Sequence, residues 1–215
     1  GKADISYSKT GYVDTWGNTT YTKGLEATVH YTLTAKNSGN IAGTLDLTDT
    51  LDSNIKEASI TVTPESLKDL VTLSDSTITG SGSLPANTTL TIEVIGKLNT
   101  NEDEITNTLG NDTVTFKGKD AAPNFVFEKT GQVGSGGNTY ILGDGKEESA
   151  TYTIKVTNNG TAAGTIKFTD TMPEGVTLNG MTPSDIEGVT LDTKNNQIDV
   201  SKNLGIGDTL TITLN

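Results

Sequence analysis

With 215 residues, the chain is long enough for one or two domains that each bury a core. A formal net charge of −12 and a calculated isoelectric point near 4.4 make it poorly suited to bind nucleic-acid phosphates or anionic membranes. The absence of cysteine excludes disulfide bonds and thiolate chemistry, and no run of 18 apolar residues is present to span a membrane.

Short segments of alternating apolar and polar residues, with turn residues about every ten positions, predict an all-β protein. In the first half of the chain we expect seven strands, near residues 4–10, 27–36, 43–51, 57–63, 70–80, 88–98 and 104–116. Residues 64–71 have room for one helical turn, and the sequence NSGN at 37–40 supplies residues that tolerate positive φ. This number and spacing of strands predict an immunoglobulin-like β-sandwich.

The second half of the chain repeats the first. Residues 30–51 read HYTLTAKNSGNIAGTLDLTDTL, and residues 151–172 align with them without a gap as TYTIKVTNNGTAAGTIKFTDTM. We therefore predict two tandem immunoglobulin-like domains, residues 1–118 and 124–215, joined by a short linker near 117–123. The second copy ends before the counterpart of segment 104–116, so we expect it to lack its last strand and to expose unpaired backbone.

Three polar side chains fall on the apolar faces of strands predicted in the first copy. Lys9 alternates with Ile5 and Tyr7, Asp49 with Leu45 and Leu47, and Asn107 with Ile105 and Leu109. A buried carboxylate is costly unless it is paired, hydrogen-bonded or protonated. The alternative is that the strand ends at Asp49 and the carboxylate caps a turn facing solvent.

Lysine, aspartate and asparagine are the side chains that an intramolecular amide bond requires. A desolvated Lys9 has a lowered pKa and can attack as a neutral amine, while a protonated Asp49 can polarise the Asn107 carboxamide and shuttle protons. Ammonia leaves, and a Lys9–Asn107 isopeptide bond remains. The reaction turns over once, so we expect neither a turnover enzyme nor a cofactor. The alternative is an ordinary ion pair between Lys9 and Asp49, with Asn107 exposed.

The second copy repeats part of this set. Phe125, Phe127 and Lys129 repeat the amine strand, and Asp170 repeats the acid. The position that corresponds to Asn107 lies beyond the end of this sequence. We therefore expect Lys129 to be a cross-link candidate without an acceptor in this chain.

Other candidate sites come from aromatic residues and from the single histidine. His30 alternates onto the outward face, and one histidine excludes a Ser-His-Asp triad and histidine metal clusters, so no metal site is expected. Trp16, Tyr12 and Tyr21 lie in the loop 11–24. This loop could bind a sugar or a protein, or its aromatic rings could cover the edge of the sandwich.

The order of these motifs resembles the isopeptide-forming immunoglobulin-like domains of Gram-positive pilins and cell-surface adhesins. The resemblance rests on Lys9, on YTLT and NSG in segment 31–39, on TDTL at 48–51 and on ITNT at 105–108. It implies that Lys9 is the amine, Asp49 the catalytic acid and Asn107 the acceptor. In the second copy it assigns Lys129 and Asp170 to the first two roles.

The resemblance also implies a function. It predicts a structural stalk segment of a bacterial fimbrial protein or adhesin, extracellular at the cell surface or cell wall. Its partners would be neighbouring domains or pilus subunits. Two other functions remain open: a ligand-binding adhesin domain that contacts a host glycan or matrix protein, and an accessory module of a secreted enzyme.

Overall fold

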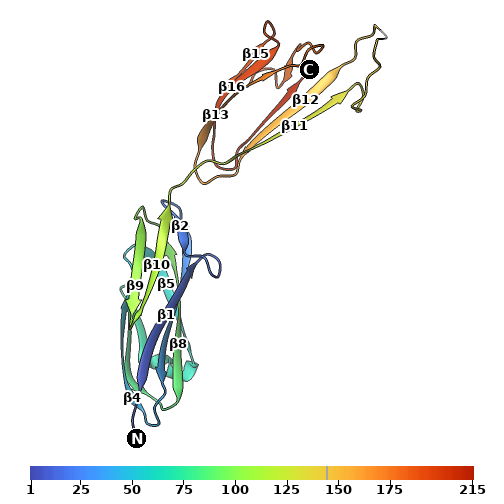
Figure 1. Cartoon of the computed structure of the whole chain (residues 1–215). Helices are drawn as coiled ribbons and strands as arrows, with labels where there is room; N and C mark the ends of the chain where they lie inside the picture. Colours follow the sequence, from blue (N-terminus) through green and yellow to red (C-terminus); the bar gives the residue numbers. More distant parts are fainter. Residues whose placement is uncertain (144) are drawn as a thin grey trace. The chain divides into compact units, whose positions relative to one another are not determined.

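The computed structural model describes residues 1–143 and 145–215, and the predicted all-β class is confirmed (Figure 1). The chain divides into two compact units, Gly1–Asp120 and Ala121–Asn215, which we call unit one and unit two. Their boundary falls within the segment 117–123, where the sequence predicts a linker. Among the described residues, no helix is long and apolar enough to cross a membrane.

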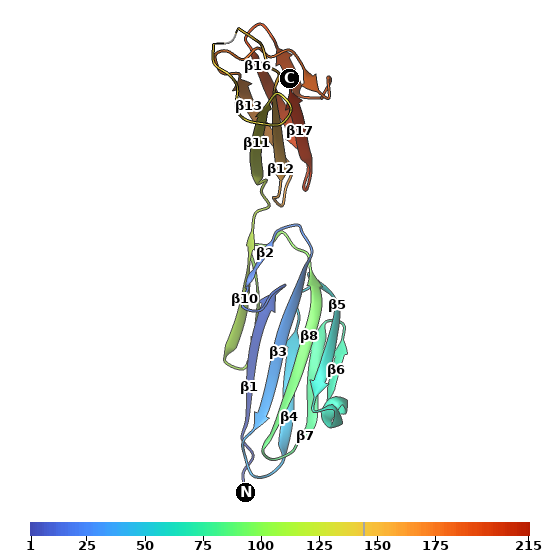
Figure 2. The same cartoon turned by 90° about the vertical axis from the view of Figure 1, so that its right-hand side faces the viewer.

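Unit one, all of whose residues are described, contains ten strands in three sheets (Figure 2). The four-stranded sheet has the order β1 (Ile5–Val13), β3 (Ala27–Asn37), β8 (Thr88–Leu98), β5 (Ile55–Thr63). A second sheet has the order β4 (Gly43–Thr50), β7 (Thr77–Leu84), β6 (Val71–Ser74), and the third has the order β2 (Thr20–Thr22), β10 (Asp112–Lys119), β9 (Glu104–Leu109). One 3₁₀ helix, η1 (Glu65–Leu70), occupies the segment where one helical turn was expected.

Two of the seven predicted strands are in fact hairpins, and β2 was not predicted. The expected strand 70–80 turns at Asp75 and Ser76, which both have positive φ, as in a type I′ hairpin. The expected strand 104–116 turns at Gly110, whose φ is 62°. Alternation alone did not reveal these turns, although Gly110 is a strong turn signal. As a result, Asn107 lies on β9, the first strand of the final hairpin.

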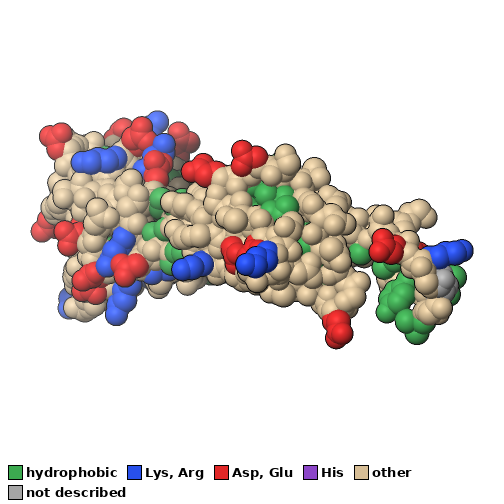
Figure 3. Space-filling model, turned by 90° about the horizontal axis from the view of Figure 1, so that it is seen from above, with side chains coloured by type: hydrophobic (Ala, Val, Ile, Leu, Met, Phe, Trp, Pro, Cys, Tyr) green, Lys and Arg blue, Asp and Glu red, His purple; other side chains and the backbone are tan. Residues whose placement is uncertain are grey.

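The core of unit one follows the predicted alternation. Along β3 and β4, buried and more exposed side chains alternate with period two. Large side chains from facing sheets meet in this core, among them Tyr31, Leu33, Leu45, Leu47, Ile78, Ile92 and Phe116. Outward positions carry mainly threonine, serine and asparagine, and Figure 3 shows charged side chains scattered over a surface that is mostly uncharged.

Unit two repeats this architecture with fewer strands. One sheet has the order β11 (Phe125–Val133), β12 (Ala150–Asn158), β17 (Thr209–Leu214), β14 (Met181–Thr182). The other has the order β13 (Gly164–Thr171), β16 (Gln197–Leu204), β15 (Val189–Asp192). The register is preserved, since Lys129 faces Ile154 across β11 and β12 as Lys9 faces Leu33 across β1 and β3. The described residues of unit two contain no counterpart of the β9–β10 hairpin.

A buried asparagine organises the same turn in each unit. The Asn37 side chain is fully buried, accepts hydrogen bonds from the backbone N–H groups of Asp4 and Gly39, and donates to the carbonyl oxygen of Leu84. Asn158 bonds in the same way in unit two. The sequence suggested positive φ in segment 37–40, and this is wrong, because no residue there has it. The asparagine is needed for its side-chain hydrogen bonds.

Candidate functional site

The lysine of the site lies on an edge strand of unit one. Lys9 is near the middle of β1, and its side chain points into the core with no solvent exposure. Its backbone N–H donates a 3.0 Å hydrogen bond to Oδ2 of Asp112, at the start of β10. This bond ties β1 to the final hairpin at the position of the lysine.

Asp49 meets this lysine from the facing sheet. It is the last inward-facing residue of β4, and its side chain is also completely buried. Lys9 Nζ donates to Asp49 Oδ2 at 2.5 Å. The alternative of a turn-capping aspartate facing solvent is therefore wrong. Period two requires Asp49 to follow Leu45 and Leu47 into the core, because β4 extends to Thr50.

The surroundings of the pair are aromatic and apolar. Lys9 Nζ lies 4.2 Å from the centroid of the Tyr31 ring, and Phe116 of β10 stacks on Tyr31 with the ring centroids 5.3 Å apart. These rings exclude water from the amine. A charged pair in such an environment gains mutual attraction but loses the hydration of both ions, so its net stabilisation is small.

Burial lowers the pKa of Lys9 below its ordinary value of 10.5, while the hydrogen bond and the negative charge of Asp49 oppose this with a smaller effect. Burial, together with the charge of Asp49, raises the pKa of Tyr31 well above its ordinary range, so its phenol stays protonated. The amine therefore loses its proton more readily than a solvated lysine does.

This lowered pKa predicts how stability depends on pH in an Asn107→Ala chain, which cannot form the bond. The unfolded chain binds more protons than the folded chain between the lowered pKa of Lys9 and about 10.5. The free energy of unfolding should therefore rise with pH through this window and level off above it. Urea denaturation at several pH values measures this, and adding Lys9→Met should remove the rise. Equal slopes with and without Lys9 would contradict the prediction.

Asn107 is buried on β9, between Ile105 and Leu109, so the alternative with an exposed Asn107 is wrong. Strand β9 lies close to both β1 and β4. The Asn107 amide nitrogen donates a 3.3 Å hydrogen bond to the carbonyl oxygen of Thr50, the residue that follows Asp49. The carboxamide is thus held beside the end of β4, where the lysine and the aspartate meet.

One oxygen of Asp49 has no hydrogen-bond partner among the described residues, although it is buried. Transfer of a proton from Lys9 to Asp49 would leave a neutral amine and a neutral carboxylic acid without changing the number of bound protons. Such a transfer would remove two opposite charges from a dry environment. The protonated acid could then donate a hydrogen bond to a neighbouring carboxamide oxygen. The structure thus places the amine and the acid in contact, with the carboxamide beside the end of β4.

In unit two the corresponding pair is more open. Lys129 Nζ lies 2.8 Å from Asp170 Oδ2 and 3.0 Å from Oδ1, and 4.8 Å from the centroid of the Tyr152 ring. The Lys129 side chain is 42% exposed and that of Asp170 18%, whereas both are 0% exposed in the pair of unit one. An open groove of about 320 Å³ runs over this pair, lined also by Phe127, Ile154 and Phe168.

The aromatic loop of unit one is divided between surface and core. Trp16 is 84% exposed and meets the edge of Tyr12, whose ring stacks on His30 at 4.3 Å. The alternative that the aromatic rings of this loop cover the edge of the sandwich therefore does not hold for Trp16. Tyr21 is buried on β2 and donates to the carbonyl oxygen of Glu102. It cannot contact a ligand, so Trp16 and Tyr12 are the remaining ligand candidates of that loop.

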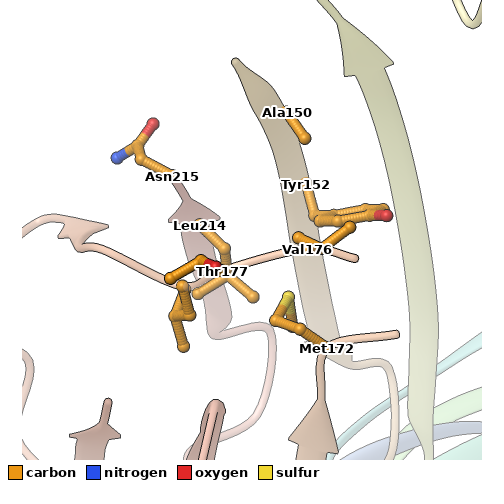
Figure 4. A pocket seen from close by; sticks show the side chains of 8 residues that line it. Ala150, Tyr152, Met172, Val176, Thr177, Leu214 and Asn215 are labelled. Atoms are coloured by element: carbon orange, nitrogen blue, oxygen red, sulfur yellow. The ribbon is translucent and has the colours of Figure 1, made fainter. Parts of the chain in front are cut away.

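A second hollow in unit two carries no site. It is lined by side chains from β12, from the end of β17 and from the loop after β13, including Tyr152, Met172, Val176 and Leu214 (Figure 4). It is too narrow to admit a water molecule. Within residues 1–143 and 145–215, no group of three potential ligands from histidine, aspartate and glutamate is placed to hold a metal ion.

Comparison of the sequence with models of known protein families found no match, and comparison with curated protein sequences also found none.

Proposed function

We propose that unit one forms an autocatalytic isopeptide bond between Lys9 Nζ and Asn107 Cγ, with Asp49 as the catalytic acid. The observation that carries this proposal is the completely buried contact between Lys9 and Asp49, beside a buried asparagine whose amide bonds to Thr50. A buried ion pair adds little net stability by itself. The proposed reaction would explain why Lys9, Asp49 and Asn107 all lie in an apolar core.

The reaction balances without any other reactant. Neutral Lys9 Nζ attacks Cγ of Asn107 while the Asp49 acid donates a hydrogen bond to Oδ1, which carries the developing negative charge. Asp49 passes its proton to Nδ2, and the carboxylate that this leaves takes a proton from the attacking nitrogen. The Cγ–Nδ2 bond breaks, ammonia leaves, and Asp49 ends the cycle unchanged.

We propose that the chain is a stalk segment of a bacterial fimbrial protein or adhesin, made of tandem immunoglobulin-like domains and displayed outside the cell. Lys9 lies near the start of unit one and Asn107 near its end. Tension on the two ends would pass through the covalent bond, so the strands between these residues would bear little force. The threonine-rich, acidic surface suits exposure to water. The chain has no cysteine, so the proposed isopeptide bond would be its covalent cross-link in place of a disulfide.

Intact-mass measurement of the purified chain tests this proposal. The expected mass is one ammonia below the mass calculated from the sequence. Asp49→Ala should restore the full calculated mass, because the acid that activates the carboxamide is lost. Asp170→Ala, the matched change in unit two, should still show the loss of one ammonia. A wild-type mass equal to the calculated value would refute the bond.

The exposure of Trp16 favours a second candidate function, a ligand-binding adhesin domain. An exposed indole beside Tyr12 offers an apolar face on which a sugar ring could stack. A glycan array and a panel of matrix proteins test this, with Trp16→Ala as the control. Binding that survives this substitution would remove the loop from consideration.

A further inference from the structure

One row of large side chains crosses the outer face of the four-stranded sheet of unit one, whose strands β1, β3, β8 and β5 are seen side by side in Figure 2. The register places Tyr12 of β1 opposite His30 of β3, and His30 opposite Ile95 of β8. Trp16, in the turn after β1, meets the edge of Tyr12 with the ring centroids 5.4 Å apart. We call these four side chains the aromatic row. Trp16 is 84% and Ile95 46% exposed, so the row is open to solvent at both ends.

The rest of this face is polar. The next two rows in register consist of hydroxyl side chains and a single carboxylate: Thr10, Thr32, Glu93 and Thr61, then Ser8, Thr34, Thr91 and Thr63. A specific protein interface usually covers about 800 Å² on each partner around an apolar centre. A strip one residue wide beside polar rows instead suits a narrow ligand that has apolar faces and hydroxyl edges. Sugar rings linked in a chain have this chemistry.

The turn that carries Trp16 is held to its neighbours by hydrogen bonds. The Asp14 backbone N–H donates to the carbonyl oxygen of Thr28 at 2.8 Å, and Asp14 Oδ1 accepts a 2.9 Å bond from the N–H of Thr28. The Asn18 side chain donates to the carbonyl oxygen of Val13 at 2.8 Å. The indole is therefore exposed on a backbone that is already ordered. Binding there costs little conformational entropy of the loop.

The polar groups of the aromatic row are free to bind a ligand. The Tyr12 ring stacks on His30 with an interplanar angle of 11°, which holds both rings in place. Among the described residues, no hydrogen bond involves the Tyr12 hydroxyl, the ring nitrogens of His30 or the indole N–H of Trp16. Tyr12 and His30 are partly exposed, so a ligand hydroxyl can replace the water at these groups.

Unit two repeats the strands of this region without the aromatic side chains. The sequence GYVDTWG at 11–17 returns as GQVGSGG at 131–137. Gly136, Gln132 and Thr151 therefore take the positions of Trp16, Tyr12 and His30. Gln132 faces Thr151 across β11 and β12 as Tyr12 faces His30 across β1 and β3. Since the strands pair in the same register without these rings, the sandwich does not require them.

We propose that the aromatic row binds a neutral, β-linked glycan chain. This inference rests on the second candidate function, ligand binding at Trp16, and assigns the class of ligand. A pyranose with equatorial hydroxyls has a flat face of C–H groups that stacks on the exposed indole. Tyr12 and His30 exchange hydrogen bonds with hydroxyls at the edge of the chain, and Ile95 contacts a further ring. An equatorial linkage keeps the chain straight, as the row across the three strands requires.

The charges near the aromatic row favour a neutral glycan over an anionic one. Asp14 lies two residues from both Tyr12 and Trp16, and Glu93 lies two residues from Ile95. Lys97, on the other side of Ile95 along β8, is already ion-paired with Glu26 and Glu57. Carboxylates accept hydrogen bonds from sugar hydroxyls but repel uronic, sialic and sulfated sugars.

The fluorescence of Trp16, the only tryptophan of the chain, tests this proposal directly. The full chain is titrated with cellotetraose and with chitotetraose, two neutral β-linked glycans. We expect a saturable shift of the emission to shorter wavelength with at least one of them, because stacking removes water from the indole. Calorimetry then compares variants that carry the residues of unit two. Tyr12→Gln and His30→Thr should each weaken binding by about tenfold or more. Tyr140→Ala, which removes an exposed tyrosine of unit two, should leave the affinity unchanged.

Two further ligands test the assigned class. Maltotetraose, which is neutral but α-linked, and tetragalacturonic acid, which is anionic, should bind at least about tenfold more weakly than the better β-linked glycan. Equal binding of either would overturn the ligand class and leave ligand binding at Trp16 in place. Binding that Tyr12→Gln and His30→Thr do not weaken would overturn the aromatic row as the site.

The remaining outcomes separate this inference from the proposed functions. If neither β-linked glycan changes the emission of Trp16, the glycan proposal is overturned. A matrix protein that binds through Trp16 would then leave the second candidate function standing, and no binding partner at all on the arrays would overturn both. The loss of ammonia from unit one is measured separately, so none of these results decides the stalk proposal.

Discussion

Asn107→Ala is expected to lower the free energy of unfolding of unit one by about 4–5 kcal/mol, by analogy with a disulfide that closes a loop of about 100 residues. The proposed bond would join positions 9 and 107, so it would constrain almost the whole of unit one in the unfolded state. For a unit of this size, the loss should lower the melting temperature by about 15 °C or more. Differential scanning calorimetry of the full chain measures the change.

A neighbouring substitution provides the control for this experiment. Thr106→Ala changes the exposed residue beside Asn107 on the same strand and leaves the three polar residues of the site in place. It should keep the loss of ammonia and shift the melting temperature by only a few degrees. A shift for Asn107→Ala as small as that for Thr106→Ala would contradict a covalent staple. The transition of unit two should stay in place in both variants.

The second large effect concerns the ion pair itself and is measured in the Asn107→Ala background, where no bond can form. Lys9→Met leaves the Asp49 carboxylate buried without its lysine partner. Removing one member of a buried pair costs about 3–5 kcal/mol, because a buried charge loses its compensation. Replacing both residues, with Lys9→Met and Asp49→Leu, should recover most of this loss. Chemical denaturation of the single and double variants gives the two values.

Unit two supplies the matched control for the ion pair. Lys129→Met removes the corresponding lysine from a pair that is partly open to solvent. Exposed pairs contribute about 0–1 kcal/mol, so this change should cost little. If Lys9→Met cost no more than Lys129→Met, burial would not control the energy of these pairs. A chemical role would then no longer be needed to account for the buried pair of unit one.

The contrast between the units shows that the same Lys-Asp motif can be fully buried in one domain and partly exposed to solvent in another. Lys-Asp pairs in equivalent strands are closed from water in unit one and partly open in unit two. The strands that carry them have nearly the same pattern. The difference comes from the β9–β10 hairpin, which adds Phe116 to the aromatic cluster and places Asn107 beside β4.

The sequence by itself determined the all-β class, the repeat and the inward direction of the polar residues. Alternation with period two decides which face of a strand a side chain takes, so the burial of Lys9, Asp49 and Asn107 could be predicted from their apolar neighbours. The internal alignment located Lys129 and Asp170 in the same way. These features depend on local patterns along a single strand, and such patterns can be read without knowing the partners of the strand.

Only the tertiary structure decided which strands meet. Period two does not say that β4 faces β1 at the level of Lys9, because the packing of two sheets depends on contacts summed over many residues far apart in sequence. It also did not show that Tyr21 is buried while Trp16 is exposed, since both lie in one loop and β2 forms only by pairing with β10. The burial of the contact between Lys9 and Asp49 follows from where the final hairpin packs, because the equivalent contact in unit two, whose described residues hold no such hairpin, is partly open to solvent.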